Sequence, residues 1–217
     1  CSSDLHASIL PKYRGASPIF SAVLNGEKES GVSMMKMAKG MDTGAVYRIH
    51  KVALEQSETT GSLEQKLAKL AGQQLVEDIQ DVVLNGLEAE ERGHAAATHC
   101  SKIDKSFGLI DWDESAESIT RKIFACQPWP GTWTYYESGG KTKRLAISSA
   151  GIAPPVSGTE VSGEISLEDG VLRVACSSSD SLEVHRVKPE GKREMAIKDF
   201  LLGADLKSGD QFVSGNT

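Results

Sequence analysis

The sequence DLHASILPKYRGASPI, residues 4–19, decides the fold of the first half of the chain. An extended segment leads to His6, and residues 7–11 then end in a proline, which indicates a strand that runs out into a loop. Pro18 begins a short predicted helix, which we expect to end near Asn25 and Gly26. Loops at strand ends are where open α/β sheets place their ligands, so this loop is a candidate ligand site.

Two further strands and one long helix are predicted in the first half. Residues 32–37 and 44–52 have the residue alternation of strands, and a glycine-marked turn, 40–44, separates them. A helix is predicted over residues 60–85, because apolar residues recur there every three to five positions before the stop signal Asn85-Gly86. We expect this apolar stripe to pack into the core rather than to bind a partner.

The sequence changes character after residue 87. Residues 88–106 are polar and alanine-rich, which predicts a linker between a first domain, 1–87, and a second domain, 107–213. The second domain begins with a predicted helix over residues 115–124. The short apolar runs that follow are punctuated by glycine and serine, a spacing that predicts a small antiparallel barrel or sandwich. These runs cover residues 132–136, 143–148, 161–167, 171–176 and 181–187.

The composition is that of an ordinary globular protein. The chain has 217 residues, of which 39% are hydrophobic and 25% charged, which excludes disordered, collagen-like and coiled-coil classes. Its apolar runs are too short to span a bilayer. The net charge of −6 gives no support for nucleic-acid binding, although a local basic face can coexist with it. No CxxC pair occurs among the cysteines, which favours a reducing cytoplasm; they are Cys1, Cys100, Cys126 and Cys176.

Two ionisable residues lie beside predicted strand-end loops: His6 precedes residues 7–11, and Asp42 lies within the turn 40–44. Because such loops carry ligands in open α/β sheets, the two side chains could form a hydrogen-bonded acid–base pair. The alternatives are a structural histidine and an aspartate that bonds the backbone of its own turn. The residues alone leave both interpretations open.

The other candidates for chemistry favour structural roles. His94, His99 and Cys100 lack the paired spacing of zinc ligands, so we predict no metal site. Trp129 and Trp133 lie in a proline-rich turn, and such residues pack against a barrel more commonly than they stack on bases. Two basic clusters are either solvated or contact phosphates; they comprise Lys141, Lys143 and Arg144, and Lys188, Lys192 and Arg193.

Several segments resemble, in order and spacing, the folate-dependent formyltransferases. Residues 4–19 resemble the signature N-x-H-x-S-L-L-P-x-x-R-G-A-x-P-I, while residues 31–35 and 41–44 resemble the later G-V-T-I-M and L-D-T-G elements. Within the family, the second half of the chain is similar to the C-terminal domain of the members that formylate methionyl-initiator tRNA. The segments that carry this similarity are residues 110–112, 128–133 and 188–193.

The resemblance implies a Rossmann-like first domain, of which this chain holds the C-terminal part, followed by a small barrel of oligonucleotide-binding (OB) type that binds tRNA. Family members carry roughly one hundred residues ahead of the signature loop, which includes the first strands of the sheet and part of the folate pocket. We therefore expect that N-terminal part to be absent here, as the missing start methionine also indicates. The implied protein is a cytoplasmic monomer that does not contact membranes.

The reaction implied by the resemblance moves the formyl group of 10-formyltetrahydrofolate to the amino group of methionine on initiator tRNA. His6 matches the family's imidazole and Asp42 its carboxylate. A charged imidazole and an amide donor would stabilise the oxyanion that develops on the formyl oxygen. The family's asparagine falls at Asp4, which has no proton to donate when ionised and would repel the oxyanion. The loop that contacts the folate matches Ser8, Ile9, Leu10 and Pro11.

Substrate contacts are predicted at the basic residues near the signature loop, in the linker and on the barrel. They comprise Arg14, Lys102, Lys105, Lys141, Lys143 and Arg144. Two alternatives stay open. The first is a related formyltransferase that acts on an amino-sugar nucleotide, against which residues 128–133 argue. The second is a non-catalytic tRNA-binding remnant, which Asp4 and the absent N-terminal part suggest.

Overall fold

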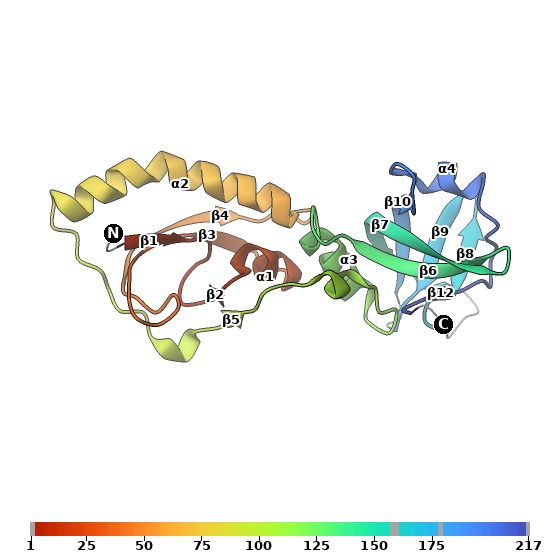
Figure 1. Cartoon of the computed structure of the whole chain (residues 1–217), viewed down its shortest axis with the longest axis horizontal. Coiled ribbons are helices and arrows are strands. Elements are labelled where there is room, and N and C mark those ends of the chain that lie inside the picture. Colours follow the sequence, from red (N-terminus) through yellow and green to blue (C-terminus); the bar gives the residue numbers. More distant parts are fainter. Residues whose placement is uncertain (1–2, 157–160, 178–179, 216–217) are drawn as a thin grey trace. The chain divides into compact units, whose positions relative to one another are not determined.

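The chain divides into two units, Cys1–Ile103 and Asp104–Thr217 (Figure 1). The structure, a computed structural model, describes residues 3–156, 161–177 and 180–215, so that Cys1 lies outside the described residues. Within these ranges, no helix has both the length and the apolar composition that crossing a membrane requires.

A three-stranded sheet forms the framework of the first unit. Its strands lie in the order β1 (Ser3–His6), β3 (Glu29–Lys36) and β4 (Val46–Ala53), and both pairs are antiparallel. The parallel arrangement implied by a Rossmann-like domain is therefore not what these strands adopt. The strands β3 and β4 pair antiparallel because only residues 37–45 connect them, and parallel neighbours need a crossover of about a dozen residues or more.

Two helices accompany this sheet. The helix α1 (Pro18–Leu24) has the predicted bounds, and α2 (Thr60–Val83) begins at a capping box formed by Thr59 and Ser62. Figure 1 shows α2 running along the sheet, where it contacts β3 and β4. The interior of β3 is buried throughout, because α2 packs on the sheet and the loop after β1 is hydrogen-bonded to Ser33.

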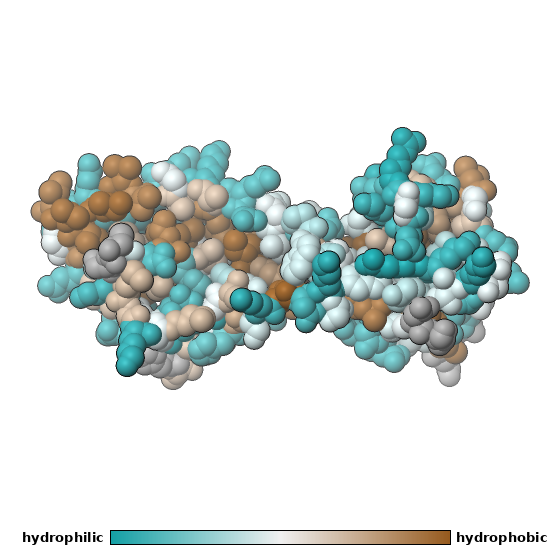
Figure 2. Space-filling view, viewed as in Figure 1, coloured by the Kyte–Doolittle hydropathy of each residue, from teal (hydrophilic) through white to brown (hydrophobic). Residues whose placement is uncertain are grey.

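The apolar stripe of α2 is buried over only part of its length. Leu63 and Leu67 are buried as predicted, whereas Ile79 and Val83, which we also expected in the core, are exposed. Figure 2 shows the resulting apolar surface over the C-terminal end of α2. The prediction was wrong there because helical periodicity shows which residues share a face, but not whether the sheet extends far enough to cover it.

The segment predicted as a linker, 88–106, is partly hydrogen-bonded to the first unit. Glu90 and Val46 exchange two backbone hydrogen bonds of 2.8 and 2.9 Å. After a 3₁₀ turn, η1 (His94–Ala96), the strand β5 (His99–Cys100) pairs in parallel with β2 (Arg14–Gly15). Polar composition predicted an extended linker, and several of its backbone groups are hydrogen-bonded to the first unit as far as Cys100.

The second unit is a curled antiparallel sheet. The strand order is β12 (Phe212–Val213), β6 (Thr132–Ser138), β7 (Lys141–Ala153), β10 (Ser181–Pro189), β9 (Val171–Ala175) and β8 (Ile165–Glu168), and β11 (Met195–Ala196) also pairs with β10. The two edges of the sheet meet. The Ile165 amide donates to the backbone carbonyl of Asp210, and the Phe212 amide donates to the backbone carbonyl of Gly163, each at 2.8 Å. The sheet thus curls into a barrel-like form; its OB-like character stays a prediction.

Helices close the core of this barrel-like sheet. The helix α3 (Ala116–Ala125) is capped by Ser115 and confirms the helix predicted over 115–124, and α4 (Ile197–Leu201) follows β11. A short 3₁₀ helix, η2 (Lys105–Gly108), opens the unit. The core includes Ile119 and Ile123 of α3, and Phe212 packs its ring against Trp112. The indole of Trp112 donates to Thr134 at 3.0 Å, so its polar atom is satisfied inside the core.

Candidate functional site

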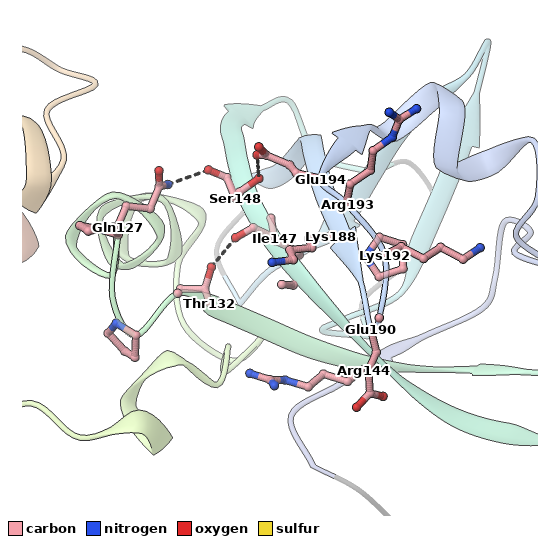
Figure 3. A pocket seen from close by; sticks show the side chains of 16 residues that line it. Gln127, Thr132, Arg144, Ile147, Ser148, Lys188, Glu190, Lys192, Arg193 and Glu194 are labelled. Carbon is pink, nitrogen blue, oxygen red and sulfur yellow. Dashed lines mark hydrogen bonds between the residues drawn. The ribbon is translucent and has the colours of Figure 1, made fainter.

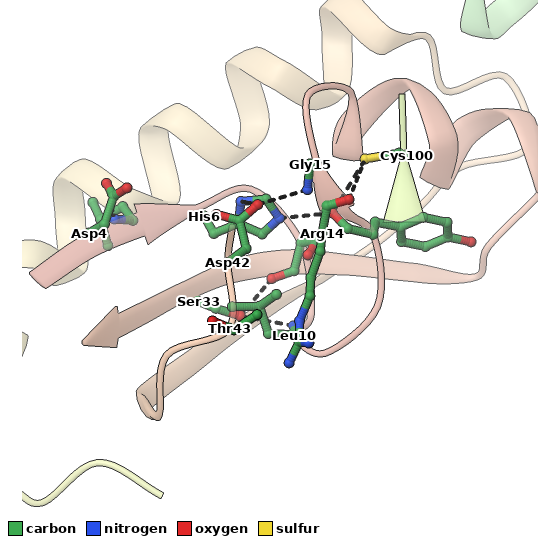
Figure 4. Close-up of polar contacts among 12 residues, drawn as sticks. Asp4, His6, Leu10, Arg14, Gly15, Ser33, Asp42, Thr43 and Cys100 are labelled. Atoms are coloured by element: carbon green, nitrogen blue, oxygen red, sulfur yellow. Dashed lines mark hydrogen bonds and ion pairs between the residues drawn. The ribbon is translucent and has the colours of Figure 1, made fainter. Parts of the chain in front are cut away.

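His6 lies at the end of β1, where its imidazole is nearly enclosed. The residue is 8% exposed, and its Nε2 lies 2.9 Å from the backbone oxygen of Tyr13 (Figure 4). Because a carbonyl oxygen can only accept, Nε2 must carry the proton in this contact. The other ring nitrogen, Nδ1, is therefore the atom of His6 that can act on a neighbour.

Asp42 faces this second nitrogen from the turn between β3 and β4. Its Oδ2 lies 3.7 Å from Nδ1 of His6 and accepts the backbone N–H of Gly15 at 2.7 Å. The backbone of Asp42 is left-handed (φ 52°), a conformation that aspartate tolerates better than most residues. The structure thus brings together the two residues predicted to be catalytic, at an ion-pair distance that is longer than a direct hydrogen bond.

The loop predicted to contact folate, residues 8–11, is braced from within. The Ser8 hydroxyl donates to the Lys12 carbonyl at 2.6 Å, while Ser33 on β3 donates to the Ser8 carbonyl and accepts the Leu10 amide. The side chains of Ser8 and Leu10 are buried and hold the loop on the sheet. Ile9 and Pro11 are half-buried, so they are the two members of the predicted set that retain apolar surface for a ligand.

Residues 98–100 hold the other side of this loop, a role that sequence reasoning missed. The Tyr13 amide donates to the Thr98 hydroxyl at 2.8 Å, and the Arg14 amide donates to the Thr98 carbonyl at 2.8 Å. A side chain at Gly15 would not fit, because its Cβ would lie 2.3 Å from the carbonyl oxygen of Cys100. No local signal predicts this pairing, since Tyr13 and Thr98 are 85 residues apart in the sequence.

Asp4 and Arg14, the other two predicted residues of this site, differ in exposure. Asp4 is exposed, lies two residues before His6 on the same face of β1, and accepts the N–H of Leu5 at 2.8 Å. Figure 4 shows Asp4 toward the start of β1, with His6, Asp42 and Gly15 gathered at its end. Arg14 is 4% exposed, so a large ligand could touch little of its side chain.

The second unit carries a groove of about 790 Å³ beside β7 and the turn that follows β10 (Figure 3). Four cationic side chains line it, of which the predicted contact set included only the first: Arg144, Lys188, Lys192 and Arg193. Figure 3 shows Arg144 and Lys188 pointing to the same side, whereas Lys192 and Arg193 extend away from them. An adjoining groove of about 390 Å³ adds Lys143 and shares Arg144 and Lys192.

The charge of this groove is not neutralised by ion pairs. Among the described residues, none of the five cations of the two grooves lies within 4 Å of a carboxylate oxygen. Instead, the Arg144 guanidinium stacks 4.1 Å from the ring centroid of Trp133. Of the acids that line the groove, Glu194 is paired with Arg186, and hydrogen bonds from Ser148 and Arg186 lower its pKa. A local positive surface therefore exists in a unit with 13 basic and 17 acidic residues.

The remaining predicted contacts lie elsewhere. Lys102, Lys105 and Lys141 are exposed, but they line neither groove. Trp133 packs beneath Arg144, which confirms the packing interpretation for that ring, while Trp129 is 51% exposed. Across the described ranges, no three His, Cys, Asp or Glu side chains are gathered as metal ligands would be.

Comparison with known proteins agrees with this arrangement of two units. Residues 4–79 match the family described as Formyl transferase, and residues 102–205 match Formyl transferase, C-terminal domain. The chain belongs to the formyl transferase family. Methionyl-tRNA formyltransferase of Pelagibacter ubique is 32% identical over 97% of this chain and 65% of its own length. The protein of the same name from Sorangium cellulosum is 37% identical over 95% of this chain and 65% of its own length.

The formyl transferase chain spans about 65% of the length of these curated relatives. Among solved structures, the sugar 3N-formyl transferase WlaRD, crystallised in the presence of dTDP and 5-N-formyl-THF, superposes with a TM-score of 0.65. That match covers 88% of this chain and 66% of the other at 19% identity. At such low identity the likeness shows a shared fold alone.

The geometry of His6 and Asp42 permits one kind of proton chemistry. The Nε2 proton of His6 is donated to the Tyr13 carbonyl. The Nδ1 proton of a charged imidazole can therefore go either to Asp42 or to an oxygen of a bound substrate. Asp42 in turn is held by the Gly15 amide, so its carboxylate keeps its orientation while the proton moves. Such an arrangement suits stabilisation of a developing oxyanion.

Proposed function

We propose that this protein transfers the formyl group of 10-formyltetrahydrofolate to the amino group of methionine esterified on initiator tRNA. The observation that carries the proposal is the facing pair of His6 and Asp42 in a chain of the formyl transferase family. The curated relatives named methionyl-tRNA formyltransferase, which match nearly the whole chain, support the choice of tRNA as acceptor.

In the proposed reaction, the neutral amine of the aminoacyl group attacks the formyl carbon. Negative charge develops on the formyl oxygen, toward which Nδ1 of a charged His6 donates its proton in a hydrogen bond. The bond between the formyl carbon and N10 of the folate then breaks. The amine loses one proton and N10 gains one, and Asp42 beside Nδ1 is the carboxylate that can carry a proton between these positions.

The contacts around His6 orient its imidazole before the substrate binds. Because Nε2 is held by the Tyr13 carbonyl, the imidazole does not need to reorient when the substrate arrives. The half-buried side chains of Ile9 and Pro11 are the apolar surface of the loop on which the folate donor would rest. The loop itself is braced by Ser33, so a ligand would meet a preformed surface.

The groove of the second unit supplies a surface for the acceptor. Its unpaired cations at Arg144 and Lys188 can meet phosphates of the tRNA backbone, and the exposed Trp129 offers a ring for stacking. Lys102, Lys105, Lys141 and Lys143 remain predicted phosphate contacts. The protein as a whole is acidic, but this groove is lined by four cationic side chains, against three in the adjoining groove.

The test is single-turnover formyl transfer with 10-formyltetrahydrofolate and initiator methionyl-tRNA, by this chain preceded by the N-terminal part that the family resemblance implies. We expect N-formylmethionyl-tRNA as the product, formed about a thousandfold more slowly by the His6→Ala protein. Formylation of an amino-sugar nucleotide in place of the tRNA would show that the acceptor is wrong. Binding of tRNA with neither folate binding nor transfer would show a non-catalytic RNA-binding protein.

A further inference from the structure

The three backbone residues 13–15 contact both members of the proposed catalytic pair. The Tyr13 carbonyl accepts the Nε2 proton of His6 at 2.9 Å, and the Gly15 amide donates to Asp42 Oδ2 at 2.7 Å. Any shift of this short segment would therefore change the surroundings of both side chains at once. What holds residues 13–15 in place decides the geometry of the pair.

The outer side of this segment is held by residues 98–100. The Thr98 hydroxyl accepts the Tyr13 amide, and the Thr98 carbonyl accepts the Arg14 amide, both at 2.8 Å. Arg14 and Gly15 then pair in parallel with His99 and Cys100. This contact lies in the part of the chain that polar composition predicted to be a linker, and no part of the proposed reaction requires it directly.

Tyr13 needs such a partner because its backbone is in a left-handed conformation, with φ at 60°. Residues with a Cβ adopt this conformation reluctantly, so a peptide left without partners would tend to relax toward negative φ. That relaxation rotates the peptide planes on either side of Tyr13 and would move its carbonyl off Nε2. The phenol also has an anchor, since it donates to Glu27 at 2.6 Å, but that bond holds the ring and not the peptide.

We propose that Thr98 is a positioning residue for His6. Its hydroxyl holds the Tyr13 amide, which keeps the Tyr13 carbonyl on Nε2 and so leaves Nδ1 directed toward Asp42. The catalytic meaning of this inference rests on the proposed function. The contacts themselves do not, and they can be tested without any turnover.

The test compares Thr98→Val with Thr98→Ser in this chain. Valine keeps the shape of threonine but removes the hydroxyl, whereas serine keeps the hydroxyl and removes a methyl group. The readout is solvent exchange of the imidazole Nε2 proton of His6, measured by NMR on histidine-labelled protein. We expect this exchange to be about fivefold faster in Thr98→Val, the change in an opening equilibrium that loss of one average hydrogen bond produces, and to be unchanged in Thr98→Ser.

His50 provides an internal control for general loosening of the first unit. Its Nε2 lies 2.8 Å from Asp78 Oδ2, which lies on α2 and not in residues 98–100. A selective change at His6 in Thr98→Val, with His50 unaffected, is the expected result. Equal acceleration at both histidines, no change at His6, or a serine variant that behaves like valine would each overturn the inference.

The transfer assay separates this inference from the proposed function. If the protein with its N-terminal part in place formylates no acceptor while the exchange result holds, the positioning contact stands and the proposed reaction does not. If transfer occurs, Thr98→Val should lower kcat about fivefold with KM for the tRNA unchanged, and Thr98→Ser should restore it. A change in KM alone would contradict a role that acts through His6.

Discussion

The His6–Asp42 site of the first unit and the basic groove of the second are held in opposite ways. The side chains of the site are held by specific partners, such as the Tyr13 carbonyl for His6 and the Gly15 amide for Asp42. The groove instead gathers exposed cations that have no ion-pair partner within the part of the chain that the structure describes. Loss of one specific contact removes its whole contribution, whereas the contributions of exposed charges add up. A single substitution should therefore have a large effect on transfer in the site and a small effect on tRNA binding in the groove.

The largest effect is expected at His6. His6→Ala removes the proton donor for the formyl oxygen and should slow single-turnover transfer by about a thousandfold, within the range for loss of a general acid–base group. Binding of tRNA, measured by filter retention, should not change, because the groove belongs to the other unit. Weaker tRNA binding in this variant would break the proposed separation of roles, and an unchanged transfer rate would exclude His6 from the reaction.

The groove should respond to summed charge. The double variant Arg144→Gln, Lys188→Gln should lower the log–log salt slope of tRNA binding by about 1.5 units, and affinity at 0.1 M salt by roughly 30-fold, since each phosphate contact contributes about 0.7 to 0.9 of a unit. Each single variant should show about half of the change in slope. This graded response is what distinguishes the groove from the site.

A matched control for total charge is the double variant Lys198→Gln, Lys207→Gln. Both lysines are exposed in the same unit, and neither lines the groove. We expect their neutralisation to leave the salt slope nearly unchanged. Should both double variants lower the slope equally, net charge rather than the groove would govern binding.

The same contrast explains how much could be predicted from the sequence. Elements that local rules determine were predicted closely, as α1 and α3 show, because Pro18 and Ser115 are start signals that act within one turn. His6 and Asp42 were also predicted as a pair, since both lie beside strand ends. The contacts of Thr98 and Cys100 could not be predicted, because they join segments more than eighty residues apart and use backbone groups that every residue carries.

The groove was predicted only in part for a related reason. Lys143 and Arg144 were assigned to phosphates, whereas Lys188, Lys192 and Arg193 were left as a separate cluster. The pairing of β7 with β10, in which Leu145 lies opposite Pro189, is what brings the two clusters to one groove. Strand order in a barrel depends on long-range pairing, which the spacing of apolar runs does not specify.

A gain of activity is expected at Asp4, which lies on the same face of β1 as His6. Asp4→Asn replaces a carboxylate by an amide that can donate a hydrogen bond to the developing oxyanion. With the absent N-terminal part restored, transfer should become about tenfold faster in single-turnover measurements, which corresponds to about 1.4 kcal/mol of transition-state stabilisation. Identical rates for the two proteins at pH 7 would mean that residue 4 does not face the formyl oxygen.

The smallest effect concerns the ring of Tyr13, whose phenol donates to Glu27 at 2.6 Å. Tyr13→Phe should lower the unfolding free energy by about 1 kcal/mol at pH 7, measured by urea denaturation with far-UV circular dichroism. The hydrogen bond from Tyr13 lowers the pKa of Glu27, so the stabilisation is present above the usual carboxyl pKa and is lost as pH falls through the folded-state value. The difference in unfolding free energy between the two proteins should therefore narrow in acid.

The alkaline range tests the phenol itself. Burial, together with the Glu27 hydrogen bond, raises the pKa of Tyr13 from 10.0 to about 12. An unfolded tyrosine ionises near the lower value, so the parent protein should lose more stability between these two pH values than Tyr13→Phe does. A difference that stays constant from acid to alkali would show that the phenol–carboxylate bond does not hold this loop.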